Sequence, residues 1–282
     1  MTRRLPTVLA AAALLLAAAL TLLPLAYLLT SSLKSNEHFF SSLLLPRGDG
    51  FLGVAWSTLT LDHYARLFRS EGFGRSLLVS LFLASVTATL ASVVCAAAGY
   101  ALAKFRFKGR AACTALVLAA VLIPAPLLLA PGYRLLHGLG LLDTFSGLIL
   151  PALAPAFGVF LFRQAILASV PDSVLESARI DGAGELRTFA LVVLPLVKPM
   201  TGTFMMITFL GVWNNFITPQ VVLQSPEKFP VAVAVAHMRG AYYQDYGLQM
   251  AATALSVLPV VLIFLALQRD FVSGLTSGAV KG

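Results

Sequence analysis

The chain has 282 residues, of which 59% are hydrophobic and 11% are charged, and its formal net charge is +8. Soluble domains carry about 25% charged residues, so this composition excludes an ordinary soluble protein and indicates an integral membrane protein. A basic balance would also fit a nucleic-acid-binding protein. We expect the positive charge to reflect membrane topology instead, and we expect no nucleic-acid partner.

Six stretches of the chain contain no Asp, Glu, Lys or Arg and are long enough to be membrane spans. A bilayer core about 30 Å thick needs about 20 helical residues, and backbone polar groups in lipid must be bonded within the segment. The sequence therefore predicts an all-α polytopic bundle of six transmembrane helices in a single domain, 1–282. They are expected at about 8–30, 76–102, 112–133, 145–163, 199–222 and 248–267.

The first span needs to be distinguished from a signal peptide, because Arg3 and Arg4 precede an Ala/Leu-rich run. A secretory apolar region is about 7–15 residues long. Here the uncharged run continues to Leu33, which favours a retained span.

Two features between the early spans carry local predictions. The stretch Leu61–Phe68 is expected to form a short amphipathic helix at the membrane interface. Pro124, Pro126 and Pro131 should kink or break the third span, since proline removes a helical hydrogen bond. The histidines are isolated, and we expect them to be solvated or interfacial: His38, His63, His137 and His237.

Positive charge sets the expected orientation. With six spans, 12 Lys and Arg residues fall on the side shared by the termini and 8 on the other side. The densest cluster is the turn Lys104–Arg110. The positive-inside rule therefore places both termini in the cytoplasm, in a multi-pass protein of the cell membrane.

The most polar stretch between spans is the loop at about 165–198. Ser169–Asp172 has the form of a capping box, and Asp181-Gly182 should stop the helix that follows. A second short helix is expected from Gly184 to about Val193, ended by Pro195. A helix of about ten residues is marginal alone. Its apolar side therefore needs to pack either against a partner protein or against the rest of its own chain.

The spacing within this loop carries a family resemblance. Glu176-Ser177-Ala178, then Gly182, then Leu194-Pro195 resembles the "EAA" motif of the permease subunits of ABC importers. Further stretches resemble the carbohydrate-type, maltose-permease-like branch: Ala97–Arg110, Gly138–Pro151, Trp213–Phe216 with Pro219, and Gly274–Gly282. Three positions depart from the usual pattern, with Ser177 in place of alanine, Val192 of isoleucine and Asn215 of a common acidic residue.

The resemblance implies partners and site residues. The loop would be a coupling helix that receives force from a separate ATPase, through Glu176, Ser177, Ala178, Asp181, Gly182, Ala183, Leu194 and Pro195. The tail would reach toward the ATPase pair with Gly278, Ala279, Val280 and Lys281. The last external loop would contact the binding protein with Gly240, Tyr242 and Tyr243, although a simple surface aromatic cluster is the alternative.

The same resemblance implies the cell membrane of a prokaryote, a second permease, two ATPase subunits, an extracytoplasmic solute-binding protein and a sugar substrate. The chain has no Gly-x4-Gly-Lys-Ser/Thr loop, so ATP and Mg are expected on the ATPase subunits and no cofactor, metal or catalytic residue on this chain. It is therefore expected to be no enzyme.

Candidate pathway residues lie in the fifth span: Trp213, Asn214, Asn215 and Phe216. An indole face and amide groups suit a sugar ring, while polar residues that hold helices together are the alternative. The predicted function is ATP-driven alternating access for a mono- or oligosaccharide. The alternatives are glycerol phosphate-type substrates in the same machine and an ion-coupled carrier, against which the uncharged spans argue.

Overall fold

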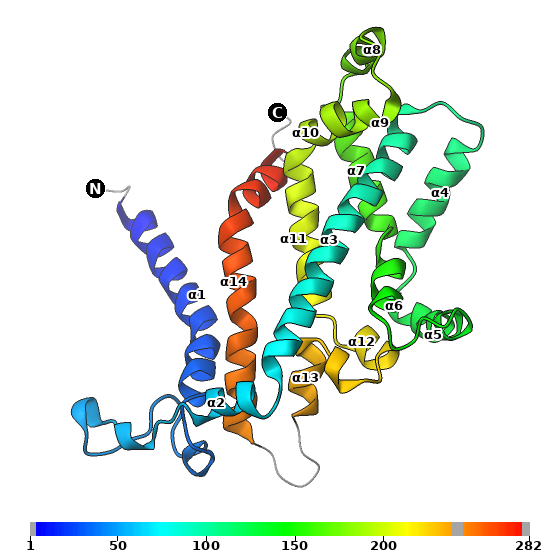
Figure 1. The fold of residues 1–282 in the computed structure, drawn as a ribbon. Coiled ribbons are helices and arrows are strands. Elements are labelled where there is room, and N and C mark those ends of the chain that lie inside the picture. Colours follow the sequence, from blue (N-terminus) through cyan, green and yellow to red (C-terminus); the bar gives the residue numbers. More distant parts are fainter. Residues whose placement is uncertain (1–3, 239–244, 278–282) are drawn as a thin grey trace. The chain divides into compact units, whose positions relative to one another are not determined.

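The structure is a computed structural model that describes residues 4–238 and 245–277 (Figure 1). Within these ranges the chain is helical, with two isolated β-bridges and no strand, so the all-α prediction is confirmed. The α-helices are α1 (Arg4–Ser31), α2 (Asp62–Arg69), α3 (Phe73–Lys104), α4 (Arg110–Val121), α5 (Leu129–Gly138), α6 (Phe145–Ile149), α7 (Ala156–Ser169), α8 (Asp172–Ile180), α9 (Glu185–Thr188), α10 (Leu194–Leu196), α11 (Lys198–Trp213), α12 (Ile217–Val222), α13 (Val231–His237) and α14 (Tyr246–Ser277).

Three of these helices, α1, α3 and α14, are each long and apolar enough to cross a membrane. Three bent pairs pass the same test together: Arg110–Val121 with Ala125–Gly138, Phe145–Ala152 with Ala156–Ser169, and Glu185–Leu196 with Lys198–Trp213. The bends are 101°, 41° and 83°. The count of six requires each pair to be one span, so it stays a prediction.

Proline explains the largest of these bends. Pro124 has an extended conformation, with φ −63° and ψ 126°, and it separates α4 from the 3₁₀ turn Ala125–Leu128 that leads into α5. The predicted break of the third span is confirmed. The fifth span was predicted as one stretch to residue 222, but α11 ends at Trp213 and α12 starts only at Ile217.

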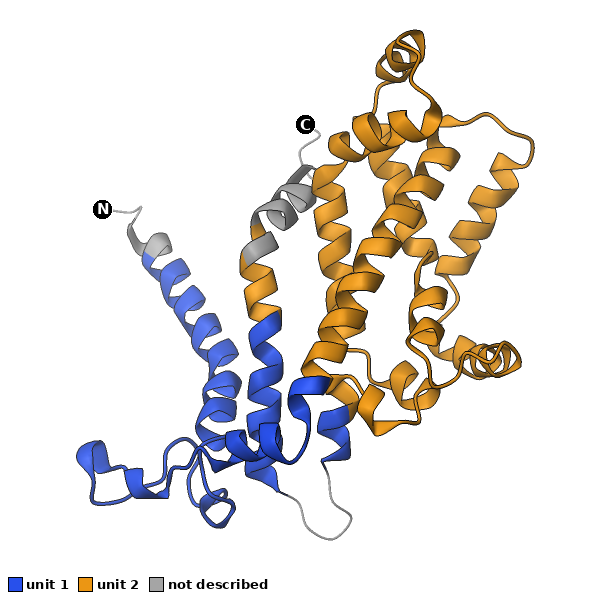
Figure 2. Ribbon diagram, in the orientation of Figure 1, with its two compact units in different colours: residues 1–75, 234–259 blue, residues 76–233, 260–282 orange. Residues whose placement is uncertain are grey.

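The chain forms two compact units (Figure 2). Unit 1 comprises 1–75 and 234–259, and unit 2 comprises 76–233 and 260–282. Both α3 and α14 have residues in each unit. The assignment of the whole chain to one domain stays a prediction.

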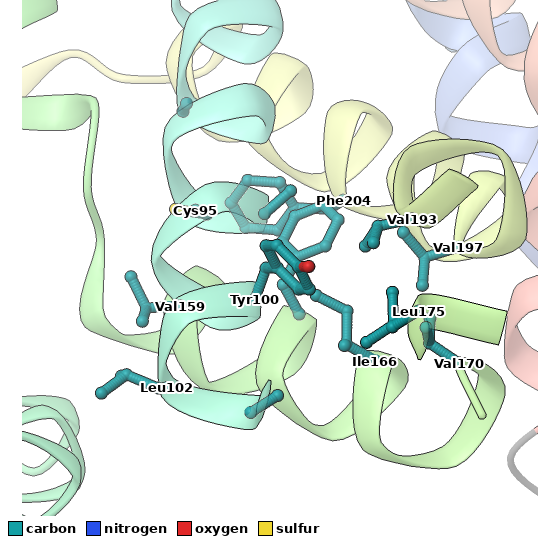
Figure 3. Close-up of a cluster of buried hydrophobic side chains, with 14 residues drawn as sticks. Cys95, Tyr100, Leu102, Val159, Ile166, Val170, Leu175, Val193, Val197 and Phe204 are labelled. Atoms are coloured by element: carbon teal, nitrogen blue, oxygen red, sulfur yellow. The ribbon is translucent and has the colours of Figure 1, made fainter. Parts of the chain in front are cut away.

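Unit 2 has a hydrophobic core built from α3, α7, α8 and α11 (Figure 3). Phe162 of α7 and Phe204 of α11 meet edge to face, with ring centroids 5.3 Å apart. Gly99 lets α3 approach α7 closely, since a Cβ there would lie 2.7 Å from the backbone nitrogen of Arg163. This crossing holds α3 and α7 together at the end of the bundle that carries the 165–198 loop.

In unit 1, the predicted short helix at 61–68 is confirmed as α2, and its place at the membrane interface stays a prediction. The prediction for His63 was wrong, because this residue of α2 is buried. His63 Nε2 donates to the backbone oxygen of Lys34 at 2.9 Å, and Nδ1 lies 3.7 Å from Asp245 Oδ1. The tertiary structure supplies both partners, and neither is near His63 in the sequence.

Candidate functional site

The predicted coupling loop at 165–198 begins differently from the expectation. The capping box was wrong, because Ser169 is the last residue of α7 and Pro171 occupies the N-cap of α8 without a side-chain hydrogen bond. Proline suits a helix start, since its fixed φ fits the first turn and its missing N–H would have no intrahelical partner there.

The C-terminal end of α8 is a closed turn at Gly182. Its φ is +77°, a conformation that residues with a Cβ rarely adopt. The Gly182 N–H donates to the oxygen of Arg179 at 3.0 Å, and the Ala183 N–H donates to that of Ala178 at 2.9 Å. These two bonds form a Schellman motif. The predicted glycine stop is confirmed.

One face of α8 belongs to the core of unit 2. Leu175 and Ala178 are buried, three residues apart, and Figure 3 shows Leu175 in the cluster with Ile166 and Val170. The helix is therefore stabilised by its own subunit, through the same i, i+3 spacing that the sequence displays.

The opposite face of α8 is open. Glu176, Ser177 and Asp181 are exposed, and the Ser177 hydroxyl donates to the Ser173 backbone oxygen within the same helix. The Glu176 and Asp181 carboxylates and the Ser177 hydroxyl therefore lie at the surface of this chain.

Charged and hydroxyl groups tie the loop to the end of α3. Lys104 Nζ lies 2.6 Å from Asp172 Oδ1, and the hydrogen bond and charge of Lys104 lower the pKa of Asp172. The Tyr100 hydroxyl donates to Glu185 Oε2 at 3.0 Å, and Arg179 pairs with Glu185 Oε1 at 3.1 Å. Sequence reasoning missed the two contacts to α3, because more than 60 residues separate Tyr100 and Lys104 from their partners.

Two large apolar side chains flank the Gly182 turn without cover from this chain. Ile180 and Leu186 are both 86% exposed. Leaving such a side chain in water costs about 1.5–3 kcal/mol relative to full burial. The sequence analysis did not single out either residue. The signal was available, because Ile180 lies outside the i, i+3 face of Leu175 and Ala178.

The second half of the loop differs from the prediction in where its helical piece ends. Pro195 does not end the helical piece, which runs from Glu185 through a π-helical segment, Phe189–Val193, into α10. The bend falls at Val197, one residue before α11. Pro195 stands inside this helical piece, two residues after the π-helical segment, and the piece ends at Leu196. Leu194 is half-buried against the core, and Pro195 is exposed.

The candidate pathway residues separate into different environments. Trp213 is 4% exposed and stacks on Phe209 with centroids 5.7 Å apart, so its indole is part of the helix contacts. Asn214 and Phe216 are exposed. Asn215 lines a cavity of about 430 Å³ in unit 2, and its Oδ1 accepts a hydrogen bond from the Thr218 N–H at 3.2 Å.

This cavity is lined mainly by aliphatic side chains of α3, α5, α6 and α12. Polar groups among its lining residues are few and come from different elements: Ser80, Thr87, Tyr133, Asn215 and Thr218. A mostly apolar wall with a few convergent polar groups is typical of small-molecule sites. The predicted binding-protein contacts Gly240, Tyr242 and Tyr243 and the tail residues Gly278, Ala279, Val280 and Lys281 lie outside the described residues.

Comparison with known families decides the identity of the chain. The family described as "Binding-protein-dependent transport system inner membrane component" matches residues 88–276. The chain belongs to this family. The match includes the whole 165–198 loop and the 430 Å³ cavity's polar residue Asn215. The permease resemblance noted in the sequence is thereby confirmed.

Two similar proteins cover almost the whole permease. The arabinooligosaccharides transport system permease protein AraQ of Bacillus subtilis (strain 168) is 35% identical over 268 residues, which cover 93% of this chain and 92% of that protein. The lactose transport system permease protein LacG of Rhizobium radiobacter is 31% identical over 279 residues, which cover 99% of this chain and 98% of that protein.

The fold of the permease is also found in a solved structure. A chain in the crystal structure of a bacterial ABC transporter involved in the import of the acidic polysaccharide alginate superposes with a TM-score of 0.80 at 23% identity. The superposition covers 96% of this permease and 99% of that chain.

Proposed function

We propose that this permease is one of two membrane subunits of an ATP-driven importer that takes up a mono- or oligosaccharide by alternating access. It works with a second permease, two ATPase subunits and an extracytoplasmic solute-binding protein. ATP and Mg bind to the ATPase subunits, and this chain contributes the pathway wall and the coupling loop. Both termini and the 165–198 loop lie in the cytoplasm.

The observation that carries this proposal is the pair Ile180 and Leu186, each 86% exposed beside the Gly182 turn. The turn is fixed by two backbone hydrogen bonds, and α8 is fixed by Leu175 in the core. A rigid element that presents apolar side chains suits a groove on another subunit. A movement of that groove would be passed directly to α3 and α7.

The sugar class is supported by the relatives. Proteins named for arabinooligosaccharide and lactose transport align with this permease over almost its whole length. Among the described residues that line the 430 Å³ cavity, none is charged, which favours a neutral substrate over a glycerol phosphate.

The decisive experiment is reconstitution in liposomes, with arabinooligosaccharides and lactose as the first probes. Uptake should require this permease, the second permease, the ATPases, ATP and the binding protein together. Sugar accumulation by this chain alone, driven by an ion gradient, would instead identify a secondary carrier.

Within the pathway we propose that Asn215 provides the substrate contact. Asn215→Leu should reduce uptake about fivefold, the equivalent of one hydrogen bond of about 1 kcal/mol. Asn215→Asp keeps the acceptor for the Thr218 N–H and controls for the stability of α12. Asn214→Leu, at the exposed neighbour, should leave uptake unchanged. Loss of complex assembly in Asn215→Leu alone would assign Asn215 to helix contacts rather than to the pathway.

A further inference from the structure

The segment between α1 and α2 in unit 1 holds large apolar side chains at its surface. Phe51 is 78% exposed, Leu52 is 79% exposed and Trp56 is 50% exposed. The Trp56 indole Nε1 donates to the Phe51 backbone oxygen at 3.0 Å, so these side chains belong to one local structure. We call residues 48–56 the apolar tip. Exposed apolar groups gathered in this way mark an interaction surface.

The backbone of the apolar tip is tightly built. The Gly48 N–H donates to the Gly53 oxygen at 3.0 Å, and the Ala55 N–H donates to the Pro46 oxygen at 2.9 Å. Gly50 allows a close approach, since a Cβ there would lie 2.2 Å from the Val54 oxygen. The exposure of the side chains is therefore a property of a defined turn.

Leu52 adds a second indication that the apolar tip serves an interaction. Its φ is +61°, in the left-handed region where a leucine is strained. Such strain is concentrated at binding and switch sites. Glycine would remove it, yet the chain places a large apolar side chain there.

The position of the apolar tip relates it to the bilayer surface. The uncharged run of the first span ends at Leu33, and α1 has 28 residues, or about 42 Å, against a hydrocarbon core of about 30 Å. The end of α1 therefore reaches the headgroup region. Figure 1 shows that the segment between α1 and α2 starts at this end of α1 and extends from it both sideways and beyond the level of α2.

We propose that the apolar tip inserts Phe51 and Leu52 into the lipid headgroup region beside α1, with Trp56 at its boundary. Aromatic side chains are enriched at this depth, where one end of the ring is apolar and the other is wet. A lipid surface is permanently available to a permease, so it covers an apolar pair at all times. A solute-binding protein that docks only transiently would leave the pair in water between cycles.

The test is photo-crosslinking in native membranes that contain the complete transporter. The photoreactive residue p-benzoylphenylalanine replaces Phe51, and the adduct is identified by mass spectrometry. A phospholipid adduct should be the main product. The same residue at Leu14, which is 71% exposed on α1, provides the positive lipid control, and at the exposed Glu176 of the 165–198 loop it should give no lipid adduct.

Each contrary outcome has a clear meaning. A main adduct with the second permease or with the binding protein overturns the proposal, as does the absence of a lipid adduct at Phe51 while Leu14 gives one. The inference relies on the proposed orientation only to assign the outer leaflet. The photoreactive residue at Leu186 examines the ATPase contact separately, so failure of the proposed function is distinguished from failure of this inference.

Discussion

The 165–198 loop and the junction between α5 and α6 both connect neighbouring helices of unit 2, yet their side chains differ in what they contact. Polar groups of the junction bond to distant parts of the same chain, whereas two large apolar side chains of the loop are exposed. At the junction, Asp143 accepts hydrogen bonds from the N–H groups of Gln224 and Ser225 at 2.9 and 3.0 Å. Lys228 Nζ donates to Asp143 Oδ2 at 2.7 Å and to its backbone oxygen at 2.6 Å. The junction therefore ties two distant segments of one chain together.

The two carboxylates that anchor these regions also differ in the number of neighbouring groups that lower their pKa values. The pKa of Asp143 lies far below its usual range because of the Lys228 and Ser225 side chains and the N–H groups of Gln224 and Ser225. The pKa of Asp172 in the loop is lowered mainly by the single cation Lys104. The junction is closed by its polar groups, whereas the loop leaves Ile180 and Leu186 exposed. Under the proposed function, this exposed pair is the surface that docks on the ATPase.

The largest effect should come from placing charge on the open surface of the loop. Ile180→Asp with Leu186→Asp removes about 3 kcal/mol or more of apolar burial on docking, which corresponds to over 100-fold in ATPase affinity. Uptake should be lost while membrane insertion stays normal. Leu139→Asp, at a residue 61% exposed next to the junction, provides the control. ATPase co-purification at the wild-type level with the double variant would contradict the docking role.

A smaller effect is expected at the turn itself. Gly182→Ala places a Cβ on a residue with φ +77°, at a cost of about 1–2 kcal/mol. Coupling should weaken, and uptake should fall several-fold with substrate binding to the binding protein unchanged. Gly184→Ala is the matched control, because Gly184 has φ −69° and its added Cβ meets nothing within 4 Å. Equal effects of the two substitutions would show that the left-handed turn is unimportant.

A substitution at the junction should lower the stability of the complex without changing its coupling to the ATPase. Asp143→Asn should lower the melting temperature of the purified complex by several degrees, with ATPase binding retained. Because folding lowers the pKa of Asp143, its stabilisation is present above the usual Asp value of about 3.9 and is lost as the pH falls below it. The difference between wild type and variant should therefore be full at pH 7 and shrink below about pH 4. A difference that is unchanged at low pH would exclude the carboxylate as its cause.

The smallest effect is expected for the ion pair of the loop. The Asp172 side chain is 79% exposed, although that of Lys104 is 9% exposed, and an ion pair that is open to water on its carboxylate side contributes little to stability. Asp172→Asn should therefore change the melting temperature much less than Asp143→Asn, measured under the same conditions. A larger shift from Asp172→Asn would reverse the comparison between loop and junction.

The sequence by itself determined the features that depend on neighbouring residues. Uncharged apolar runs required helices, Pro124 broke one of them, and Gly182 ended α8 because only glycine enters the left-handed region without strain. The spacing of Glu176, Gly182 and Pro195 identified the family.

Only the tertiary structure decided which side chains were covered. Trp213 was expected in a pathway or among helix contacts and lies against Phe209, and His63 was expected to be solvated or interfacial and is buried. The partners of Asp143 lie about 80 residues away. Local patterns reveal that a helix has an apolar face, as with Leu175, but not whether the tertiary structure covers an apolar residue of a short helix, as with Leu186. Burial is a property of contacts between distant segments, and the positions of those segments are set by the packing of the whole fold.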